Sequence, residues 1–263
     1  MYEFNYHKPA TLADAARLLG NEDAKLVAGG MTLVPTLKQR LAKPSDLVDL
    51  ATIGGLKGIT EEGGGLTIGA MTRHVEVQRS DVVKRAIPAL AALAGMIGDP
   101  AVRNRGTIGG SIANNDPAAD YPSAAVGLGA TVVTSKREIA ADDFFTGMFE
   151  TALGQDEIVT AVKFPRPQAA AYQKFKNPAS RYAIVGVFVA RTGSGVRVAV
   201  TGAAPCVFRV PEMEAALAKS FTADAIKDIA IPDSGLNSDI HASAEYRAHL
   251  VNVMARRAVA ACA

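Results

Sequence analysis

The first fifty residues alternate between short apolar segments and polar turns, and this pattern predicts a small parallel unit. Thr11 is a good cap for a helix over residues 12–19. An apolar segment at 24–28 predicts a strand, leucines spaced four apart predict a helix over 33–41, and residues 47–50 predict a second strand. Strand, helix and strand in this order favour two parallel strands joined by a crossover helix.

The pattern changes after residue 53. Two apolar segments, 56–60 and 66–70, flank a Glu/Gly-rich turn and predict a hairpin. Thr72 is expected to cap a helix through residue 77, and a second helix is expected over 82–96, with a kink at Pro88. The pattern then predicts a loop over 98–123, a strand over 127–133, an aromatic loop over 144–149 and a strand over 157–164.

A Pro- and Ala-rich segment at 165–171 indicates a boundary. Beyond it we expect a strand over 171–176, an antiparallel pair at 183–190 and 195–200, and two helices, at 211–218 and from 243 to the end. The last part is therefore predicted to be a small α+β module.

The loop at 98–123 is rich in glycine and small polar residues, which favours a binding site. Gly106, Gly109 and Gly110 allow the backbone to approach a ligand closely. Consecutive N–H groups in such a turn suit an anion, typically a phosphate, and Thr107 and Ser111 add hydroxyl groups. The alternative is a glycine-rich surface turn without a ligand.

A second anion site is predicted where the first strand passes into its helix through Gly29 and Gly30. This order points backbone N–H groups and the positive helix end at a ligand above the turn. Neither G-x-G-x-x-G nor G-x-x-x-x-G-K-[ST] occurs, so a Rossmann site and a P-loop are disfavoured. Two glycine turns could together hold a diphosphate, a group that FAD contains.

The composition limits which kinds of partner and cofactor this chain is expected to bind. Of the 263 residues 49% are hydrophobic and 6% aromatic, and the net charge is +2, which disfavours a nucleic-acid binder. We expect a cytoplasmic chain, because the N-terminus lacks a signal-peptide pattern and no apolar run reaches about 18 residues. Cys206 and Cys262 are too few to hold an iron–sulfur cluster, so any cluster must lie in another chain.

No catalytic triad, paired-carboxylate site or metal-ligand spacing is evident, and the histidines are scattered along the chain. We therefore expect no catalytic side chain and no metal ligand here, and the chemistry would be that of a cofactor. Arg103 and Arg105 have two interpretations: surface salt bridges, or contacts with a cofactor or partner.

Four segments match a known family in the right order. They are A-G-G-M-T-L-V-P-T-L-K-Q-R-L at 28–41, T-I-G-A-M-T at 67–72, G-D-P-A-V-R-N-R-G-T-I-G-G-S-I-A-N-N-D-P-A-A-D-Y-P at 98–122, and S-D-I-H-A-S-A-E-Y-R at 238–247. They resemble the FAD-binding medium subunit of the molybdenum hydroxylases, the xanthine dehydrogenase and aerobic carbon monoxide dehydrogenase family. The resemblance covers nearly the whole chain.

The resemblance implies an α+β fold with an FAD-binding domain of the PCMH type over residues 1–169. This domain would comprise a small parallel α/β subdomain at about 1–52 and a larger mixed or antiparallel subdomain at 53–169. Non-covalent FAD would lie between them, and residues 170–263 would form the C-terminal medium-subunit module.

The resemblance also implies a function in electron transfer. Electrons would come from a molybdopterin centre in a large subunit, pass through two-iron clusters in a small subunit, and reach the FAD of this chain. The final acceptor would be NAD, oxygen, a quinone or another molecule. The assembly would be a dimer of heterotrimers.

The family's cofactor contacts can be carried over to positions of this sequence. The pyrophosphate would be held by Leu26, Val27, Ala28, Gly29, Gly30, Met31, Thr32 and Leu33, and by Thr107, Gly109, Gly110 and Asn114; Ser111, proposed above for its hydroxyl group, completes the candidate cofactor contacts. Asp120 would bind the ribose or adenosine portion, Ile97 and Val159 would pack near the ring system, Lys176 would lie beside the flavin and Tyr182 over it. Met31 and Thr32 depart from the family, which often has His or Gln followed by Ser.

Two other classes of function remain open at this point. A self-contained flavin oxidase acting on a small alcohol or amine would need a proton acceptor near the ring, for which Asp116, Asp120 and Tyr121 are candidates. A non-catalytic binding module would leave the two glycine turns unexplained.

Overall fold

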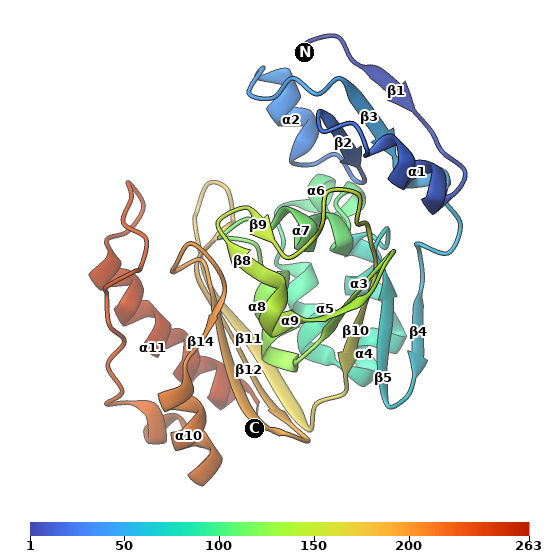
Figure 1. The fold of residues 1–263 in the computed structure, drawn as a ribbon. Coiled ribbons are helices and arrows are strands. Elements are labelled where there is room, and N and C mark those ends of the chain that lie inside the picture. Colours follow the sequence, from blue (N-terminus) through green and yellow to red (C-terminus); the bar gives the residue numbers. More distant parts are fainter. Residues whose placement is uncertain (263) are drawn as a thin grey trace.

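The alternating segments at the N-terminus form a three-stranded parallel sheet in the computed structural model, which describes residues 1–262 (Figure 1). Its elements are β1 (Asn5–His7), α1 (Leu12–Leu18), β2 (Ala24–Val27), α2 (Leu33–Lys38) and β3 (Asp46–Asp49), with strand order β1-β3-β2. Thr11 caps α1 as predicted, accepting from the Asp14 N–H at 3.1 Å. The parallel pairing of β2 with β3 confirms the predicted unit, whereas the sequence pattern gave no sign of the three-residue β1.

A five-stranded antiparallel sheet forms the middle of the molecule. Its strands, in sheet order, are β4 (Ile59–Glu62), β5 (Gly65–Gly69), β10 (Val159–Pro165), β6 (Thr131–Thr134) and β7 (Glu138–Ala140). Leu66, Ile68 and Phe164 from this sheet share one buried core with α3 (His74–Arg79), α4 (Asp81–Ala86) and α5 (Pro88–Gly95). The predicted hairpin and the predicted strand near residues 157–164 are confirmed.

The C-terminal part is a four-stranded antiparallel sheet with helices on one face. Its elements are β11 (Ala169–Lys176), β12 (Ala183–Thr192), β13 (Gly195–Thr201), β14 (Phe208–Arg209), α10 (Pro211–Lys219), η2 (Ala223–Ile226) and α11 (Ala244–Ala261). Tyr172 and Phe188 join the core of the middle part, while Val187 and Val189 pack with α11 on the other face. The predicted strand pair and helices are confirmed; the predicted extension of the last helix to residue 263 lies outside the described residues.

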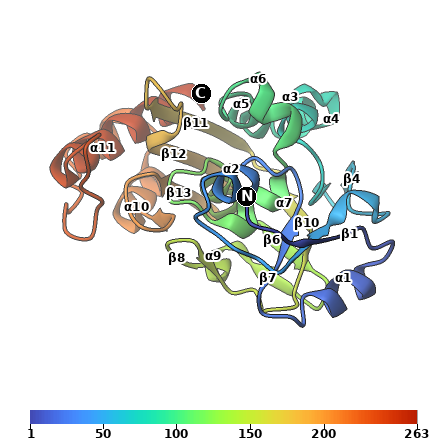
Figure 2. The ribbon, with the colours of Figure 1, turned by 90° about the horizontal axis from the view of Figure 1, so that it is seen from above.

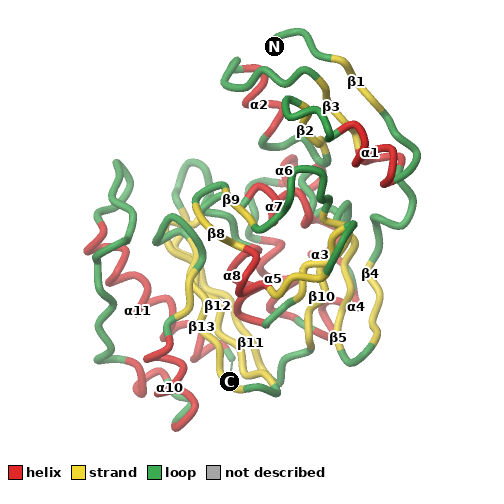
Figure 3. Tube along the Cα trace, in the orientation of Figure 1, coloured by secondary structure: helices red, strands yellow, loops and turns green. Residues whose placement is uncertain are grey.

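The predicted loop at 98–123 is wrong, because most of this segment is helical. It contains α6 (Pro100–Arg105), α7 (Ile108–Asn114) and the start of α8 (Tyr121–Leu128), red in Figure 3. Asp99 and Thr107 cap α6 and α7 by accepting from backbone N–H groups at 2.9 and 3.1 Å. Every residue of α8 is buried, so tertiary packing forms a helix where the apolar pattern predicted a strand from residue 127.

Three smaller predictions are also corrected. Thr72 does not cap a helix: its hydroxyl bonds to the Gly58 backbone, and α3 begins at His74. Pro88 starts the separate helix α5 instead of kinking a longer one, since proline suits the first helical position. The expected aromatic loop at 144–149 contains the end of α9 (Ala141–Phe144) and β8 (Phe145–Gly147), which pairs with β9 (Glu150–Thr151).

The N-terminal sheet lies over α7, both in the side view and from above (Figures 1 and 2). A short η1 (Leu50–Thr52) leads the chain from this unit into the middle part. None of the described helices is long and apolar enough to cross a membrane. Because the N-terminal sheet lies over α7, the turn after β2 meets the turn before α7. There the Gly29 backbone approaches the Arg105 backbone.

Candidate cofactor site

A cavity of about 590 Å³ lies at this junction, within the usual range for small-molecule and cofactor sites. The N-terminal unit contributes the turn from Ala28 to Leu33, and the middle part contributes the first turn of α7. The C-terminal sheet contributes Lys174 and the loop 180–182. All three parts of the chain thus supply walls of one site.

The turn after β2 leaves a row of backbone donors free. Within the described chain, none of the N–H groups from Gly29 to Thr32 donates to a protein acceptor. Gly30 has φ 74°, in the left-handed region that favours glycine, and Thr32 precedes α2 without a side-chain cap. A Cβ at Gly29 would lie 2.1 Å from the Arg105 carbonyl oxygen, so glycine is needed for the close approach of the two turns. Free donors beside a helix N-terminus form an anion-binding concavity.

In the turn before α7, the backbone N–H groups are not free as expected. The N–H groups of Ile108 and Gly109 donate to Thr72 O and Ala70 O at 3.0 and 2.9 Å, and that of Gly110 donates to Thr107 Oγ1. These bonds fix the turn to β5 and its following segment. Its contribution to a ligand is therefore shape and side-chain hydroxyl groups, and the predicted backbone anion site in this turn is corrected accordingly.

The two glycines of this second turn, Gly109 and Gly110, have different structural roles. A Cβ at Gly109 would lie 2.4 Å from the Ala70 Cβ, so Gly109 is required for packing. At Gly110 a Cβ would meet only Thr107 Oγ1 at 3.0 Å and Ala28 Cβ at 3.7 Å. Gly110 therefore keeps open the space between the two turns.

A buried polar cluster closes the cavity on the side of the C-terminal sheet. Lys174 Nζ lies 2.9 Å from the Asp120 carboxylate, and the Tyr172 hydroxyl donates to Asp120 Oδ1 at 2.5 Å. The Lys174 and Asp120 side chains are 2% and 4% exposed, so this ion pair is almost fully desolvated. Burial raises the pKa of Asp120, and the Lys174 ammonium and Tyr172 hydroxyl oppose that shift.

Most of the residues predicted from the sequence line this cavity. They are Leu26, Ala28, Gly29, Gly30, Met31, Thr32, Leu33, Ile97, Thr107, Gly109, Gly110, Ser111, Asn114, Asp120, Val159 and Tyr182. Val27 and Lys176 are not in the lining, whereas Lys174 is. A shift in strand register between Phe175 and Lys176 breaks the alternation that would put Lys176 on the same face as Tyr172 and Lys174.

Several lining residues were not singled out by the sequence. They include Lys25, Met71, His74, Phe149, Ile158, Lys174 and Arg181. Met71 lies inside the matched segment at 67–72, and Lys25, His74 and Ile158 neighbour predicted residues or segments, so proximity in sequence is the only signal for them. Arg103, in contrast, forms no salt bridge in the described structure: it donates to Ile97 O and Gly98 O, both at 3.0 Å, and so fixes a turn that lines the cavity.

His74 is buried beneath the second turn. Its Nδ1 has no hydrogen-bond partner among the described residues, and its Nε2 lies 2.5 Å from where a Cβ at Gly106 would be. Burial, together with the nearby Arg103 charge, lowers the pKa of His74 to about 4. The ring is therefore neutral at pH 7 and presents a polar, uncharged wall.

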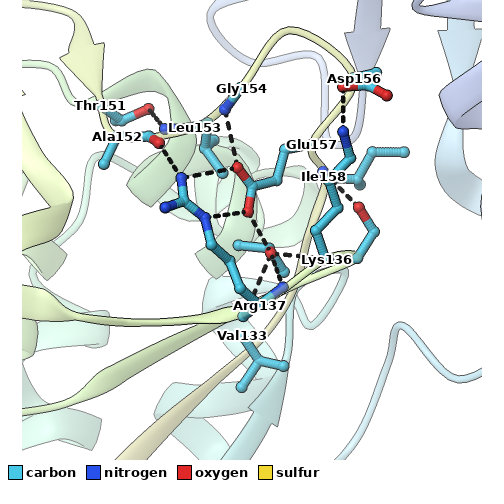
Figure 4. Close-up of polar contacts among 12 residues, drawn as sticks. Val133, Lys136, Arg137, Thr151, Ala152, Leu153, Gly154, Asp156, Glu157 and Ile158 are labelled. Atoms are coloured by element: carbon cyan, nitrogen blue, oxygen red, sulfur yellow. Dashed lines mark hydrogen bonds and ion pairs between the residues drawn. The ribbon is translucent and has the colours of Figure 1, made fainter.

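A network around Glu157 holds the segment that leads through Ile158 into β10 (Figure 4). Ile158 and Val159 both line the cavity. Glu157 Oε1 accepts from Arg137 Nε at 3.0 Å and from Thr134 Oγ1 at 2.6 Å, and Oε2 accepts from the Gly154 N–H at 2.9 Å. These bonds, that to Arg137 first, lower the pKa of Glu157 to about 2. The network fixes the start of β10 at the cavity wall.

The chain matches two family models end to end. Residues 2–167 match the FAD binding domain in molybdopterin dehydrogenase, and residues 170–262 match the carbon monoxide dehydrogenase flavoprotein C-terminal domain. The chain belongs to the family of FAD-binding medium subunits of the molybdenum hydroxylases. It is thus an FAD-binding subunit of the oxidoreductase class, as the sequence resemblance implied.

Individual relatives agree over nearly the full length. The chain is 38% identical to the nicotine 6-hydroxylase medium subunit of Paenarthrobacter nicotinovorans, covering 97% of this chain and 95% of the relative. It is 36% identical to the carbon monoxide dehydrogenase medium chain of Hydrogenophaga pseudoflava, over 97% and 96%. A structure of carbon monoxide dehydrogenase from that organism superposes with a TM-score of 0.90, covering 99% of this chain and 97% of the other at 36% identity. The α+β fold is the one expected.

Proposed function

We propose that this chain is the electron-transferring flavoprotein subunit of a molybdenum hydroxylase. It would receive electrons from iron–sulfur clusters of a partner subunit and pass them through FAD to an external acceptor. The observation that carries the proposal is the row of free N–H groups from Gly29 to Thr32, in a cavity walled by an FAD-binding family domain.

The donor set of the cavity suits FAD. The free N–H groups are matched to a diphosphate, Gly110 leaves the space that a side chain would fill, and the volume suits a cofactor. When bound, FAD supplies the redox chemistry, since it can exchange electrons in single or paired steps. Thr107, Ser111 and Asn114 would hold the phosphate and ribityl side, and the Asp120–Lys174 pair would orient the rest.

The cofactor is proposed to be non-covalent, because neither glycine turn contains a His or Cys that could form a flavin linkage, and His74 in the lining is buried beneath the second turn. Acid precipitation should release all of the flavin into the supernatant. Colour that stays in the protein pellet would contradict this.

The remaining parts of the assembly follow from the same proposal. A large molybdopterin-binding subunit and a small iron–sulfur subunit would join this chain in a dimer of heterotrimers, with NAD, oxygen, a quinone or another molecule as acceptor. Several relatives are named medium subunits or chains, which supports an assembly of unequal subunits. Within this chain, residues 1–169 would be the FAD-binding domain, with subdomains at about 1–52 and 53–169, and 170–263 the C-terminal module.

The arrangement of Asp120 removes one candidate proton acceptor of a self-contained oxidase, whereas Asp116 lines the cavity and accepts only from the Ala118 N–H, at 2.9 Å. That alternative needs a carboxylate free to accept a proton, but the Asp120 carboxylate is already engaged by Lys174 and Tyr172. Tyr121 is fully buried and burial raises its pKa, so its hydroxyl is no proton acceptor either.

Anaerobic mixing tests the proposal. The FAD-loaded chain is combined with candidate aldehydes, purines, carbon monoxide, small alcohols and amines, and the flavin absorbance is followed. We expect bleaching only after the molybdopterin and iron–sulfur subunits are added. Bleaching by a small alcohol or amine with this chain alone would overturn the electron-transfer proposal and favour the oxidase.

A further inference from the structure

One aromatic side chain at the cavity has no role in the account so far. Phe149 lies in the turn between β8 and β9, its side chain is 55% exposed, and it lines the cavity. It belongs to no buried core, so packing within the chain does not explain its position. A large exposed aromatic residue on a cavity wall is suited to contact a ligand.

The backbone at Phe149 is strained. Its φ is 58°, in the left-handed region that bulky residues rarely occupy. Such strain persists only where surrounding contacts impose it, and it concentrates at functional positions. The backbone conformation at Phe149 is therefore held by its neighbours and not by local preference.

The contacts that hold the backbone of Phe149 in this conformation come from Asn115. Its side-chain amide donates to Gly147 O at 2.8 Å and to Glu150 O at 2.7 Å, on either side of the turn, and its carbonyl accepts from the Phe149 N–H at 3.1 Å. Asn115 is buried, with 1% of its surface exposed. It directly follows α7, whose first turn contains Gly109 and Gly110. The turn that carries Phe149 is thus linked through Asn115 to the α7 wall of the cavity, which contains Gly109 and Gly110.

A second turn, held locally by the asparagine that begins it, carries Tyr182. The Oδ1 of the buried Asn177 accepts from the N–H groups of Ala179 and Ser180 at 2.9 and 3.1 Å, and the Asn177 N–H donates to Tyr182 O at 2.8 Å. The neighbouring Arg181 has φ 64°, and Tyr182 is 48% exposed in the cavity lining. Two asparagine-anchored turns, from different parts of the chain, therefore each present a half-exposed aromatic ring to one cavity.

We propose that Phe149 completes an aromatic gate over the cavity beside Tyr182, the residue that the family resemblance already implies over the flavin, and that Phe149 shields the bound cofactor from molecules in solution. The inference rests on the proposed binding of FAD in this cavity. Aromatic rings pack well against a planar ring system and exclude water from it. Phe149 is then a positioning and access-controlling residue that limits which acceptors reach the cofactor.

The test compares Phe149→Ala with Met148→Ala in the assembled, FAD-loaded complex. Met148 is the adjacent residue, is 49% exposed and does not line the cavity, so it is a matched control. Quenching of the flavin fluorescence by acrylamide measures access; this quencher is uncharged and is not biased by Lys25 or Arg181. We expect Phe149→Ala to increase the quenching constant clearly above that of Met148→Ala, and Phe149→Tyr to restore it.

The dissociation constant for FAD gives a second readout. From the usual strength of aromatic stacking, Phe149→Ala should weaken binding by about twofold to tenfold, with Phe149→Leu in between. If Phe149→Ala matches Met148→Ala in both quenching and affinity, the gate is refuted. If the wild-type chain binds no FAD at all, the proposed function itself fails, which is a distinguishable result.

Discussion

Gly110 is a residue at which cofactor binding and folding are separable. Unlike Gly29 and Gly109, it has no backbone or core neighbour that a methyl group would overlap: the methyl group would project between the two turns, 3.0 Å from Thr107 Oγ1, and requires only a small shift of that side chain. Gly110→Ala should therefore leave the fold intact and weaken FAD binding by at least about tenfold, the loss that corresponds to one hydrogen bond to a charged group.

Gly193→Ala is the matched control, since a Cβ at Gly193 would meet nothing within 4 Å. Titration of the apo chain with FAD gives the affinities, and thermal unfolding checks the fold. Equal affinities for the two variants would show that Gly110 does not face the cofactor.

The buried Asp120–Lys174 pair makes a second prediction at the residue scale. Asp120→Asn leaves the Lys174 ammonium buried without its counter-charge, which should cost about 3–5 kcal/mol in the free energy of unfolding. Adding Lys174→Met should recover much of that loss, because both charges are then gone. Urea unfolding of the apo chain measures all three variants; additive effects of the two substitutions would contradict a coupled pair.

Sequence reasoning located both glycine turns and predicted the backbone donors of the first, but not that the donors of the second are bonded within the protein. Glycine content indicates where the backbone can approach a ligand, yet whether an N–H group is free depends on distant acceptors, here Thr72 O and Ala70 O. The sequence likewise did not indicate Lys174, which lines the cavity where Lys176 does not, because the register shift after Phe175 leaves no mark in the residue pattern. Such contacts are set by tertiary structure.

At the element scale, short helices were the hardest to predict. α6 and α7 have six and seven residues, lengths that are not stable alone, and their glycines and arginines resemble a loop. The longer amphipathic α11 and the strands β12 and β13 were predicted well, since burial imposes a repeated pattern on them.

The Glu157 network should stabilise the start of β10 in a pH-dependent way. Because the pKa of Glu157 falls from 4.5 to about 2 on folding, its contribution is fully present above about pH 4.5 and is lost as the pH falls towards 2. Glu157→Gln should cost about 2 kcal/mol at pH 7, and the difference from wild type should shrink as the pH falls below 4.5. Urea unfolding at several pH values measures this; a constant difference would show that the carboxylate charge is not responsible.

At the scale of the whole molecule, the cavity exists only where the three parts of the chain meet. The N-terminal unit supplies free N–H groups, the middle part supplies a rigid turn, and the C-terminal sheet supplies Lys174. The order of predicted elements was enough to infer the parallel unit and the antiparallel module. The way these parts face one another was implied by the family resemblance and, from the residues alone, only by the hypothesis that two glycine turns could hold one diphosphate, because no local pattern records a contact between distant segments.

The central claim is that the turn from Gly29 to Thr32 holds the diphosphate of FAD with its backbone, while the turn before α7 provides shape. Amide hydrogen exchange with and without FAD tests this most directly. We predict that exchange slows strongly at residues 29–32, and slows much less at residues 108–110, whose N–H groups are already bonded within the protein. No change at 29–32 on saturation with FAD, or protection confined to 108–110, would contradict the account.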